Sequence, residues 1–323
     1  MERFTSVDVC SGAGGLALGL ERAGFDPVLV LDRHQDACNT LRHNRPRWKT
    51  LQADLLNFDP VEHPEAYDVD LLSADLPRVR SQATQSRRET GEELALIRAT
   101  LYLTHAVQPR VLLIDNVPQL VNHPAYEDIR EFIGKELIHL GYGIHYLVLN
   151  AVDFGVPQVR PHGFVVAFKD AAAARRFEVP KPTVAQHNTV GEVLLKSMIT
   201  RGWSGAAGWA RKADRPGPTL VGGSDKRGGA DLGPSRSKKI WATMGINGKS
   251  LADVVPGPDG GQGKDPIGEL KKITVDQAAT LQGFPSDWVI TGRKTVRYRQ
   301  VGHATPPPVG EALGKAIASA LRG

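Results

Sequence analysis

Short apolar runs alternate with stretches of helical spacing through the first half of the chain. The apolar runs predict strands, and the stretches with apolar residues every three or four positions predict helices. The expected strands lie at 4–10, 27–31, 50–52, 69–73, 110–114, 144–149 and 163–168, and the expected helices at 14–23, 91–107 and 126–140. This alternation is typical of an α/β protein with a doubly wound, mostly parallel sheet.

The first apolar run leads into a glycine turn, Gly12-Ala13-Gly14-Gly15, and helical spacing begins at Leu16. Side chains at these glycines would block the approach of a ligand to the backbone at the helix N-terminus. The turn is therefore typical of the opening unit of a nucleotide-binding domain. A purely structural turn has the same spacing, so the turn alone does not decide between the two.

Two acidic residues follow the next two expected strands. Asp32 ends the second strand about twenty residues after the glycines, where such folds bind ribose hydroxyls. Its alternative role is to cap the next helix. Asp54 follows the third strand and is placed to accept a hydrogen bond from an adenine amino group, or to serve as an ordinary loop residue.

The composition changes after Lys169. From about 180 to 270 the chain is rich in Gly, Pro, Ser, Lys and Arg and lacks a clear period, which predicts a small, loop-dominated second domain. Its isolated tryptophans, Trp203, Trp209 and Trp241, are expected in its core. Flexible backbone and cations occur together near its centre, which indicates phosphate contact or, alternatively, a solvated loop. The DNA-binding candidates are Arg215, Thr219, Leu220, Gly222, Gly223, Lys226 and Arg227.

Composition adds weaker constraints. The 323 residues carry a net charge of +5, with a pI of about 9.2, which favours an anionic partner such as nucleic acid. The only cysteines, Cys10 and Cys38, exclude a disulfide framework and a multi-cysteine zinc site. The chain has no apolar run of membrane-spanning length, so we expect a cytoplasmic, nucleoid-associated protein with no membrane partner.

Taken in order, these segments resemble the cytosine-C5 DNA methyltransferases over nearly the whole chain. The family pattern Asp-Leu-Phe-x-Gly-x-Gly-Gly appears at 8–15, Tyr/Phe-Gly-Val-Pro-Gln-x-Arg-x-Arg at 154–162, Leu-Gln-Gly-Phe-Pro at 281–285, and Gln-x-Gly-Asn-x-x-Pro-Pro at 300–307. Each glycine motif is common by itself, whereas the ordered set is specific.

The resemblance implies a Rossmann-like methyltransferase fold that uses S-adenosyl-L-methionine. It implies a catalytic-type domain of residues 1–180, completed by 286–323, and a DNA target-recognition domain of residues 181–285. The implied cofactor-binding residues are Cys10, Gly12, Gly14, Gly15, Leu16, Asp32, Arg33, Asp54, Leu55, Pro77, His303 and Ala304.

The residues that carry the family's chemistry have changed. The family adds a cysteine thiolate to C6 of a flipped cytosine, supports the base with a glutamate and holds it with arginine. Here the proline before the nucleophile is kept as Pro77, but Arg78 occupies the nucleophile position, and arginine is not a nucleophile. The glutamate position holds Asp115. Of the two arginine positions, Arg160 is kept and the second is His162, while His303 replaces the family's asparagine.

Two interpretations follow. In the first, the chain binds double-stranded DNA without forming 5-methylcytosine by itself and serves as a recognition or regulatory partner of an active methyltransferase subunit or a restriction-modification component. In the second, it is an active methyltransferase with altered target-base chemistry, because Asp75-Leu76-Pro77 distantly resembles the Asp-Pro-Pro-Tyr segment of amino-methyltransferases. The aromatic residue of that segment is absent. A decaying gene product with residual DNA affinity is the third alternative.

Overall fold

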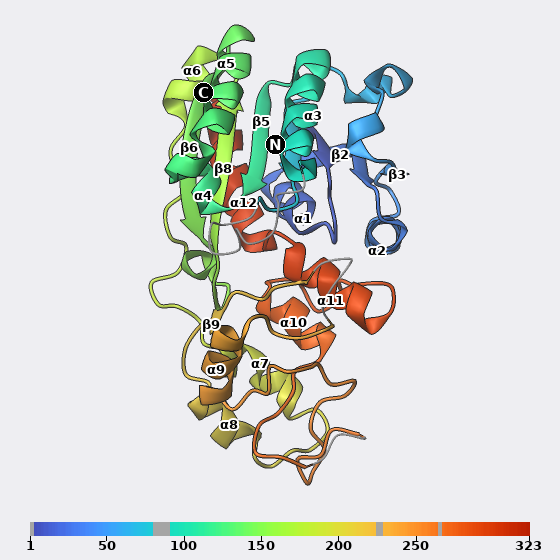
Figure 1. Ribbon diagram of the computed structural model, residues 1–323, viewed down its shortest axis with the longest axis vertical. Helices are drawn as coiled ribbons and strands as arrows, with labels where there is room; N and C mark the ends of the chain where they lie inside the picture. The colour runs from blue at the N-terminus through green and yellow to red at the C-terminus, as the bar shows by residue number, and fades with distance from the viewer. Residues whose placement is uncertain (1–2, 80–90, 224–228, 264–266) are drawn as a thin grey trace. The chain divides into compact units, whose positions relative to one another are not determined.

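The protein divides into two compact units, which are coloured along the chain in Figure 1. The structure is a computed structural model that describes residues 3–79, 91–223, 229–263 and 267–323. The first unit comprises Met1–Leu149, Pro161–Lys181 and Val309–Gly323, and the second comprises Asn150–Arg160 and Pro182–Pro308. The sequence-based division placed all of 286–323 with the first unit, whereas 286–308 belong to the second.

The first unit is built on a seven-stranded sheet with the order β3-β2-β1-β4-β5-β8-β6. Neighbouring strands from β3 to β5 are parallel, and β8 is antiparallel to β5. The mostly parallel sheet expected from the sequence is therefore confirmed. The strands are β1 (Phe4–Val9), β2 (Phe25–Asp32), β3 (Thr50–Gln52), β4 (Leu71–Asp75), β5 (Val111–Asn116), β6 (Gly143–Asn150) and β8 (Pro161–Phe168).

Helices cover both faces of this sheet, with α3 and α5 on one face and α1 and α12 on the other (Figure 1). The bounds are α1 (Gly15–Ala23), α2 (Gln35–Asn44), α3 (Glu92–Val107), α4 (Pro118–Asn122), α5 (Glu127–His139), α6 (Ala171–Arg176) and α12 (Pro307–Arg322). Helix α12 packs directly on α1. The two helices are so close that a β-carbon on Gly310 would lie 3.0 Å from the Leu16 carbonyl oxygen, and one on Gly314 would lie 2.5 Å from Ala23 Cβ. The two glycines permit this close approach.

The second unit contains more helix than its composition predicts. Its elements are β7 (Gln158–Val159), α7 (Val190–Met198), α8 (Ala206–Lys212), β9 (Gly217–Pro218), α9 (Ser235–Thr243), α10 (Val275–Leu281) and α11 (Lys294–His303). Helix α7 begins with a capping box between Thr189 and Glu192, a signal that is present in the sequence. Trp209 and Trp241 are buried, as expected for core tryptophans, whereas Trp203 is only half-buried.

Helix α11 crosses the Val221–Gly222 backbone at very short range. A β-carbon on Gly302 would lie 2.4 Å from Gly222 N. This packing explains why 286–308 fold with the second unit. None of the helices within the described ranges is long and apolar enough to cross a membrane.

Candidate functional site

The glycine turn of the first unit leaves backbone open to a ligand at the start of α1. Cys10, Gly12 and Gly14 have φ values of 55°, 53° and 79°, so the chain reverses tightly between β1 and α1. Helix α1 begins at Gly15 without a side-chain cap on its first N–H groups. A β-carbon on Gly12 would meet nothing within 4 Å. The turn therefore fits the cofactor that the sequence implies.

The acidic residues expected beside the turn are fixed by backbone N–H groups. Asp32 is 6% exposed; its Oδ2 accepts from Gly12 N–H at 2.8 Å and its Oδ1 accepts from His34 N–H at 2.7 Å. The carboxylate thus ties the turn to the end of β2. Each oxygen keeps a second lone pair for a ribose hydroxyl.

The remaining cofactor candidates of the first unit have local partners. Asp54 Oδ1 accepts from Leu56 N–H at 3.0 Å and caps the short 3-10 helix Leu55–Asn57. Arg33 forms an ion pair with Glu92. Leu16 and Leu55 are buried. Asp54 thus has a local capping role that its loop alternative did not specify, and its adenine contact stays a prediction.

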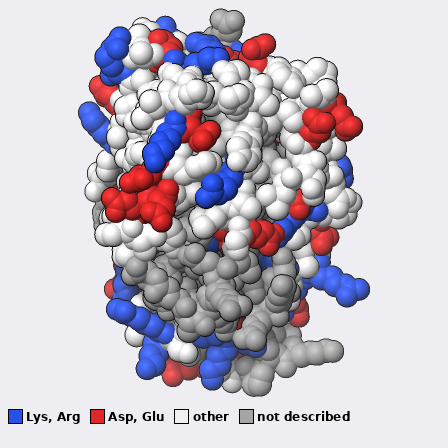
Figure 2. All heavy atoms as spheres, turned by 45° about the horizontal axis from the view of Figure 1, so that its top comes forward, with Lys and Arg blue, Asp and Glu red and all other residues white. Residues whose placement is uncertain are grey.

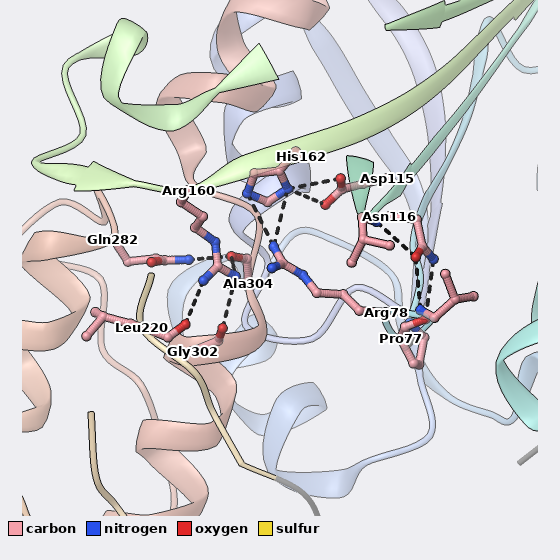
Figure 3. A network of polar contacts seen from close by, with 12 residues as sticks. Pro77, Arg78, Asp115, Asn116, Arg160, His162, Leu220, Gln282, Gly302 and Ala304 are labelled. Carbon is pink, nitrogen blue, oxygen red and sulfur yellow. Dashed lines mark hydrogen bonds and ion pairs between the residues drawn. The ribbon is translucent and has the colours of Figure 1, made fainter. Parts of the chain in front are cut away.

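Asn116, at the end of β5, holds the segment that carries the nucleophile position. Its Oδ1 accepts from Val79 N–H at 3.0 Å, and its Nδ2 donates to the Pro77 carbonyl at 3.4 Å (Figure 3). Arg78 lies between these two anchors, so its backbone is tied to β5. The sequence reading missed Asn116, although the preserved Asp115-Asn116-Val117 run contains it.

The Arg78 side chain points to His162, which is itself bonded to Asp115 (Figure 3). Arg78 Nη2 lies 3.4 Å from both ring nitrogens of His162, a position that suits a cation against the ring better than a strong hydrogen bond. His162 Nδ1 lies 2.9 Å from Asp115 Oδ2, and both side chains are buried. Three of the changed positions therefore form one charged cluster, which we call the Arg78 cluster (Arg78, Asp115 and His162).

Both cysteine thiols of the chain have a raised pKa. Burial and the nearby carboxylates of Asp32 and Asp75 raise the pKa of the Cys10 thiol far above its ordinary value. Burial also raises the pKa of the Cys38 thiol, whose Sγ lies 3.3 Å from the Asp32 carbonyl oxygen on the α2 side of β2. Both thiols are thus held in the protonated form, which is not nucleophilic.

Asp8 is a second buried acid of the first unit that the sequence reading did not single out. It is 1% exposed and pairs in register with Ser73 of β4, whose hydroxyl donates to Asp8 Oδ2 at 2.5 Å. Asp8 Oδ1 has no hydrogen-bond partner within the described residues. Burial raises the pKa of Asp8 to about 7; the hydroxyls of Ser11 and Ser73 lower it, and Asp75 and Asp32 raise it by smaller amounts. An acid in the strand four residues before the glycine turn was the available sequence signal.

In the second unit, Arg160 is fully buried and binds backbone carbonyls. Its guanidinium donates to Leu220 O at 2.7 Å, Gly302 O at 2.9 Å and Ala304 O at 3.2 Å (Figure 3). Gln158 joins the same network, since its Oε1 accepts from Leu220 N–H at 2.7 Å and its Nε2 donates to Gln282 Oε1. We call Gln158, Arg160 and Gln282 the Arg160 node. These bonds hold protein backbone, and the expected contact of Arg160 with a base stays a prediction.

The node brings together residues that the sequence reading assigned to different ligands. Leu220, a DNA candidate, and Ala304, a cofactor candidate, both bind Arg160. His303 Nε2 lies 2.8 Å from the carbonyl oxygen of Gly223, another DNA candidate. Hydrogen bonds from Arg160 and His303 therefore hold the backbone segment 220–223 against the end of α11 within the second unit.

Two of the other DNA candidates have hydrogen-bond partners in the second unit, and two lie outside the described residues. Thr219 Oγ1 donates to the Val159 carbonyl at 2.8 Å, and Arg215 bonds Asp214 and Thr243 while its side chain is 47% exposed. Lys226 and Arg227 lie outside the described residues. On the face drawn in Figure 2, basic and acidic side chains are mixed, so the net positive charge is not gathered there.

Comparison with known proteins gives a consistent result. The family model for C-5 cytosine-specific DNA methylase matches residues 4–319. Type II methyltransferase M.NaeI of Lentzea aerocolonigenes is 38% identical over 99% of this chain and 76% of its own length. Type II methyltransferase M.NgoMIV of Neisseria gonorrhoeae is 36% identical over 99% of both chains.

Solved structures share the fold at much lower identity. Schizosaccharomyces pombe Dnmt2 methyltransferase superposes with a TM-score of 0.65 at 16% identity, covering 99% of this chain and all of that one. Entamoeba histolytica methyltransferase EhMeth gives 0.67 at 14% identity and covers both chains fully. The Rossmann-like methyltransferase fold is thereby confirmed.

Proposed function

Since the chain belongs to the C-5 cytosine-specific DNA methylase family, we propose that it recognises double-stranded DNA without forming 5-methylcytosine by itself. In this role it acts as a recognition or regulatory subunit beside an active methyltransferase or another restriction-modification component. The Arg78 cluster carries the proposal, because the atom that should attack the base is replaced by a guanidinium packed on His162.

Covalent catalysis at cytosine needs a thiolate that adds to C6 and makes C5 electron-rich. Arg78 stays protonated and donates only. The two thiols of the chain have raised pKa values. Asp115, at the position that should support the base, is held at 2.9 Å by His162. The changed positions therefore support one another, and restoring one residue leaves the others in place.

DNA recognition is supported by what the second unit retains. The Arg160 node fixes Leu220 through both its N–H and its carbonyl group. Segment 219–223 precedes the basic stretch of the sequence. A segment with a fixed backbone can contact phosphates and so set the position of the protein on a duplex. This part of the proposal does not depend on any chemistry at Arg78.

The decisive experiment measures transfer of tritiated methyl groups to mixed-sequence DNA, followed by nucleoside analysis. We expect no labelled 5-methylcytosine above background from the natural chain. We expect none from Arg78→Cys either, since the Asp115–His162 pair remains. Arg78→Ser is the matched control, of nearly the same size as cysteine but without a thiolate. Labelled 5-methylcytosine from the natural chain, or from Arg78→Cys but not Arg78→Ser, would overturn the corresponding statement.

Binding is tested separately by fluorescence anisotropy with labelled duplexes at several salt concentrations. We expect binding that weakens linearly in log Kd against log salt, because phosphate contacts release counterions. The absence of binding at low salt and micromolar protein would refute the recognition role.

The second candidate function is methyl transfer to another atom of the base. The observation that favours it is Asp75, which ends β4 and pairs in register with Asp115, in the segment that resembles an amino-methyltransferase motif. Labelled N-methylated bases in the same nucleoside analysis would support this function over the first.

A further inference from the structure

Helix α9 of the second unit carries basic side chains on one exposed face. Arg236, Lys239, Ile240 and Thr243 are all exposed. Their spacing of three, four and seven positions places them side by side on the helix surface. The side chains of Arg236 and Lys239 form no hydrogen bond or ion pair with any residue that the structure describes. Two positive charges of this face are therefore open to a ligand.

The buried side of α9 fixes the direction of this face. Trp241 is fully buried, and its ring lies so close to β9 that a β-carbon on Gly217 would come within 2.2 Å of it. Helix α9 accordingly lies beside β9 in Figure 1. On the flank of the helix, Lys238 forms an ion pair with Asp231 at 3.1 Å. The exposed cations thus project from a packed helix and not from a loop.

Arg215 extends the basic face at the end of α9. Its Nη2 donates to Thr243 Oγ1 at 2.6 Å, and its Nη1 lies 3.0 Å from Asp214 Oδ1. Asp214 offsets one of the three positive charges. The bond to Thr243 holds the exposed guanidinium in line with Lys239 and Arg236. We call Arg215, Lys239 and Arg236 the α9 row.

The start of α9 lies against the segment that the Arg160 node holds in place. A β-carbon on Gly233, just before the N-cap residue Pro234, would lie 3.4 Å from Val221 Cγ2. Val221 follows Leu220, whose N–H and carbonyl groups are both bonded to the node. The α9 row and segment 219–223 are therefore neighbouring parts of one packed structure.

The length of the α9 row fits a polyanion with closely spaced charges. Positions 236 to 243 span about 10 Å along the axis of a helix that rises 1.5 Å per residue. One strand of DNA rises about 3.4 Å per phosphate, so this length corresponds to about three phosphates. We propose that the α9 row binds consecutive phosphates of one strand of duplex DNA. The inference rests on the proposed recognition of DNA and assigns its backbone contacts to named residues. Such contacts position a protein on a duplex without reading its sequence.

Fluorescence anisotropy with two labelled duplexes of unrelated sequence tests this inference on the full-length chain. Each lost phosphate contact lowers the slope of log Kd against log salt by about 0.9. The double variant Arg236→Gln with Lys239→Gln should therefore lower the slope by about 1.8. Between about 50 and 200 mM salt, the Kd of the natural chain should then rise on the order of tenfold more than that of the variant. The loss should be the same for both duplexes.

Two variants serve as controls. Lys196→Gln removes one charge from the exposed side of α7 in the same unit, and it should keep the slope of the natural chain, whereas Lys239→Gln alone should lower it by about 0.9. Arg236→Lys with Lys239→Arg keeps both charges and should keep the slope. Thermal unfolding checks that each variant is folded.

The outcomes separate this inference from the proposed function. If the natural chain binds DNA and the double variant keeps its slope, the α9 row does not contact phosphates, while DNA recognition stands. That result would leave the row to an acidic protein partner. A loss confined to one duplex would also overturn the inference, because it would indicate contact with bases. No binding by the natural chain at low salt would refute the recognition role and the inference with it.

Discussion

Replacing Arg160 with methionine tests whether this residue holds the second unit together. Methionine keeps most of the apolar stem and removes the guanidinium. The Ala304 carbonyl keeps Gln282 as a donor, but Leu220 O and Gly302 O each lose the donor that Arg160 supplies. A buried carbonyl left without a donor costs about 1–3 kcal/mol. Two such groups cost about 2–6 kcal/mol, and removal of a buried charge offsets part of this, so we expect a loss of about 2–4 kcal/mol.

Urea unfolding followed by tryptophan fluorescence is the suitable assay. Trp203, Trp209, Trp241 and Trp288 belong to the second unit, so the signal reports mainly on that unit. Arg215→Met is the matched control, because Arg215 is 47% exposed and its ion pair contributes at most about 1 kcal/mol.

A loss below about 1 kcal/mol for Arg160→Met, no larger than that of Arg215→Met, would refute the structural role of the guanidinium. Arg160 would then be available for contact with a base, as the family resemblance implies. A large loss would show that the preservation of Arg160 has a structural cause within the second unit.

Three further outcomes are expected. Gly302→Ala should destabilise the second unit by about 3 kcal/mol or more in urea unfolding, since its β-carbon would lie 2.4 Å from Gly222 N; an unchanged midpoint would contradict the close crossing. Gly134→Ala, whose β-carbon meets nothing within 4 Å in α5, should instead stabilise the first unit by about 0.5–1 kcal/mol, measured by urea unfolding followed by far-ultraviolet circular dichroism. The pKa of Asp8 is raised from 3.8 to about 7 in the folded chain, so its contribution to stability is present at low pH and is lost as the pH rises through that window. Relative to Asp8→Asn, the natural chain should therefore lose on the order of 3 kcal/mol between pH 5 and pH 8, and equal pH profiles would rule out a raised pKa for Asp8.

The parts of the fold that are set by local patterns were predictable from the sequence. The glycine turn and the strand that ends at Asp32 follow from hydrophobic spacing and from the conformational freedom of glycine. The helices of the second unit were missed because its glycines and prolines obscure the period. One of them, α7, has a readable start at Thr189 and Glu192.

Contacts between distant segments could not be predicted in the same way. Arg160 binds carbonyls that lie 60 and 142 positions away along the chain, and no local pattern specifies such partners. The family resemblance identified Arg78 and His162 as changed positions, but their mutual contact is a property of the fold. The orphaned oxygen of Asp8 likewise depends on what β2 and β4 bring beside β1.

The packing of α12 on α1 has a consequence for synthesis of the chain. Gly310 and Gly314 of α12 close over the helix that follows the glycine turn, yet the ribosome produces them after the entire second unit. Until α12 has been made, the side of α1 that it covers is exposed, and the glycine turn precedes a helix that lacks its packing partner. The helical layer beside this turn is therefore completed only after the second unit has been made.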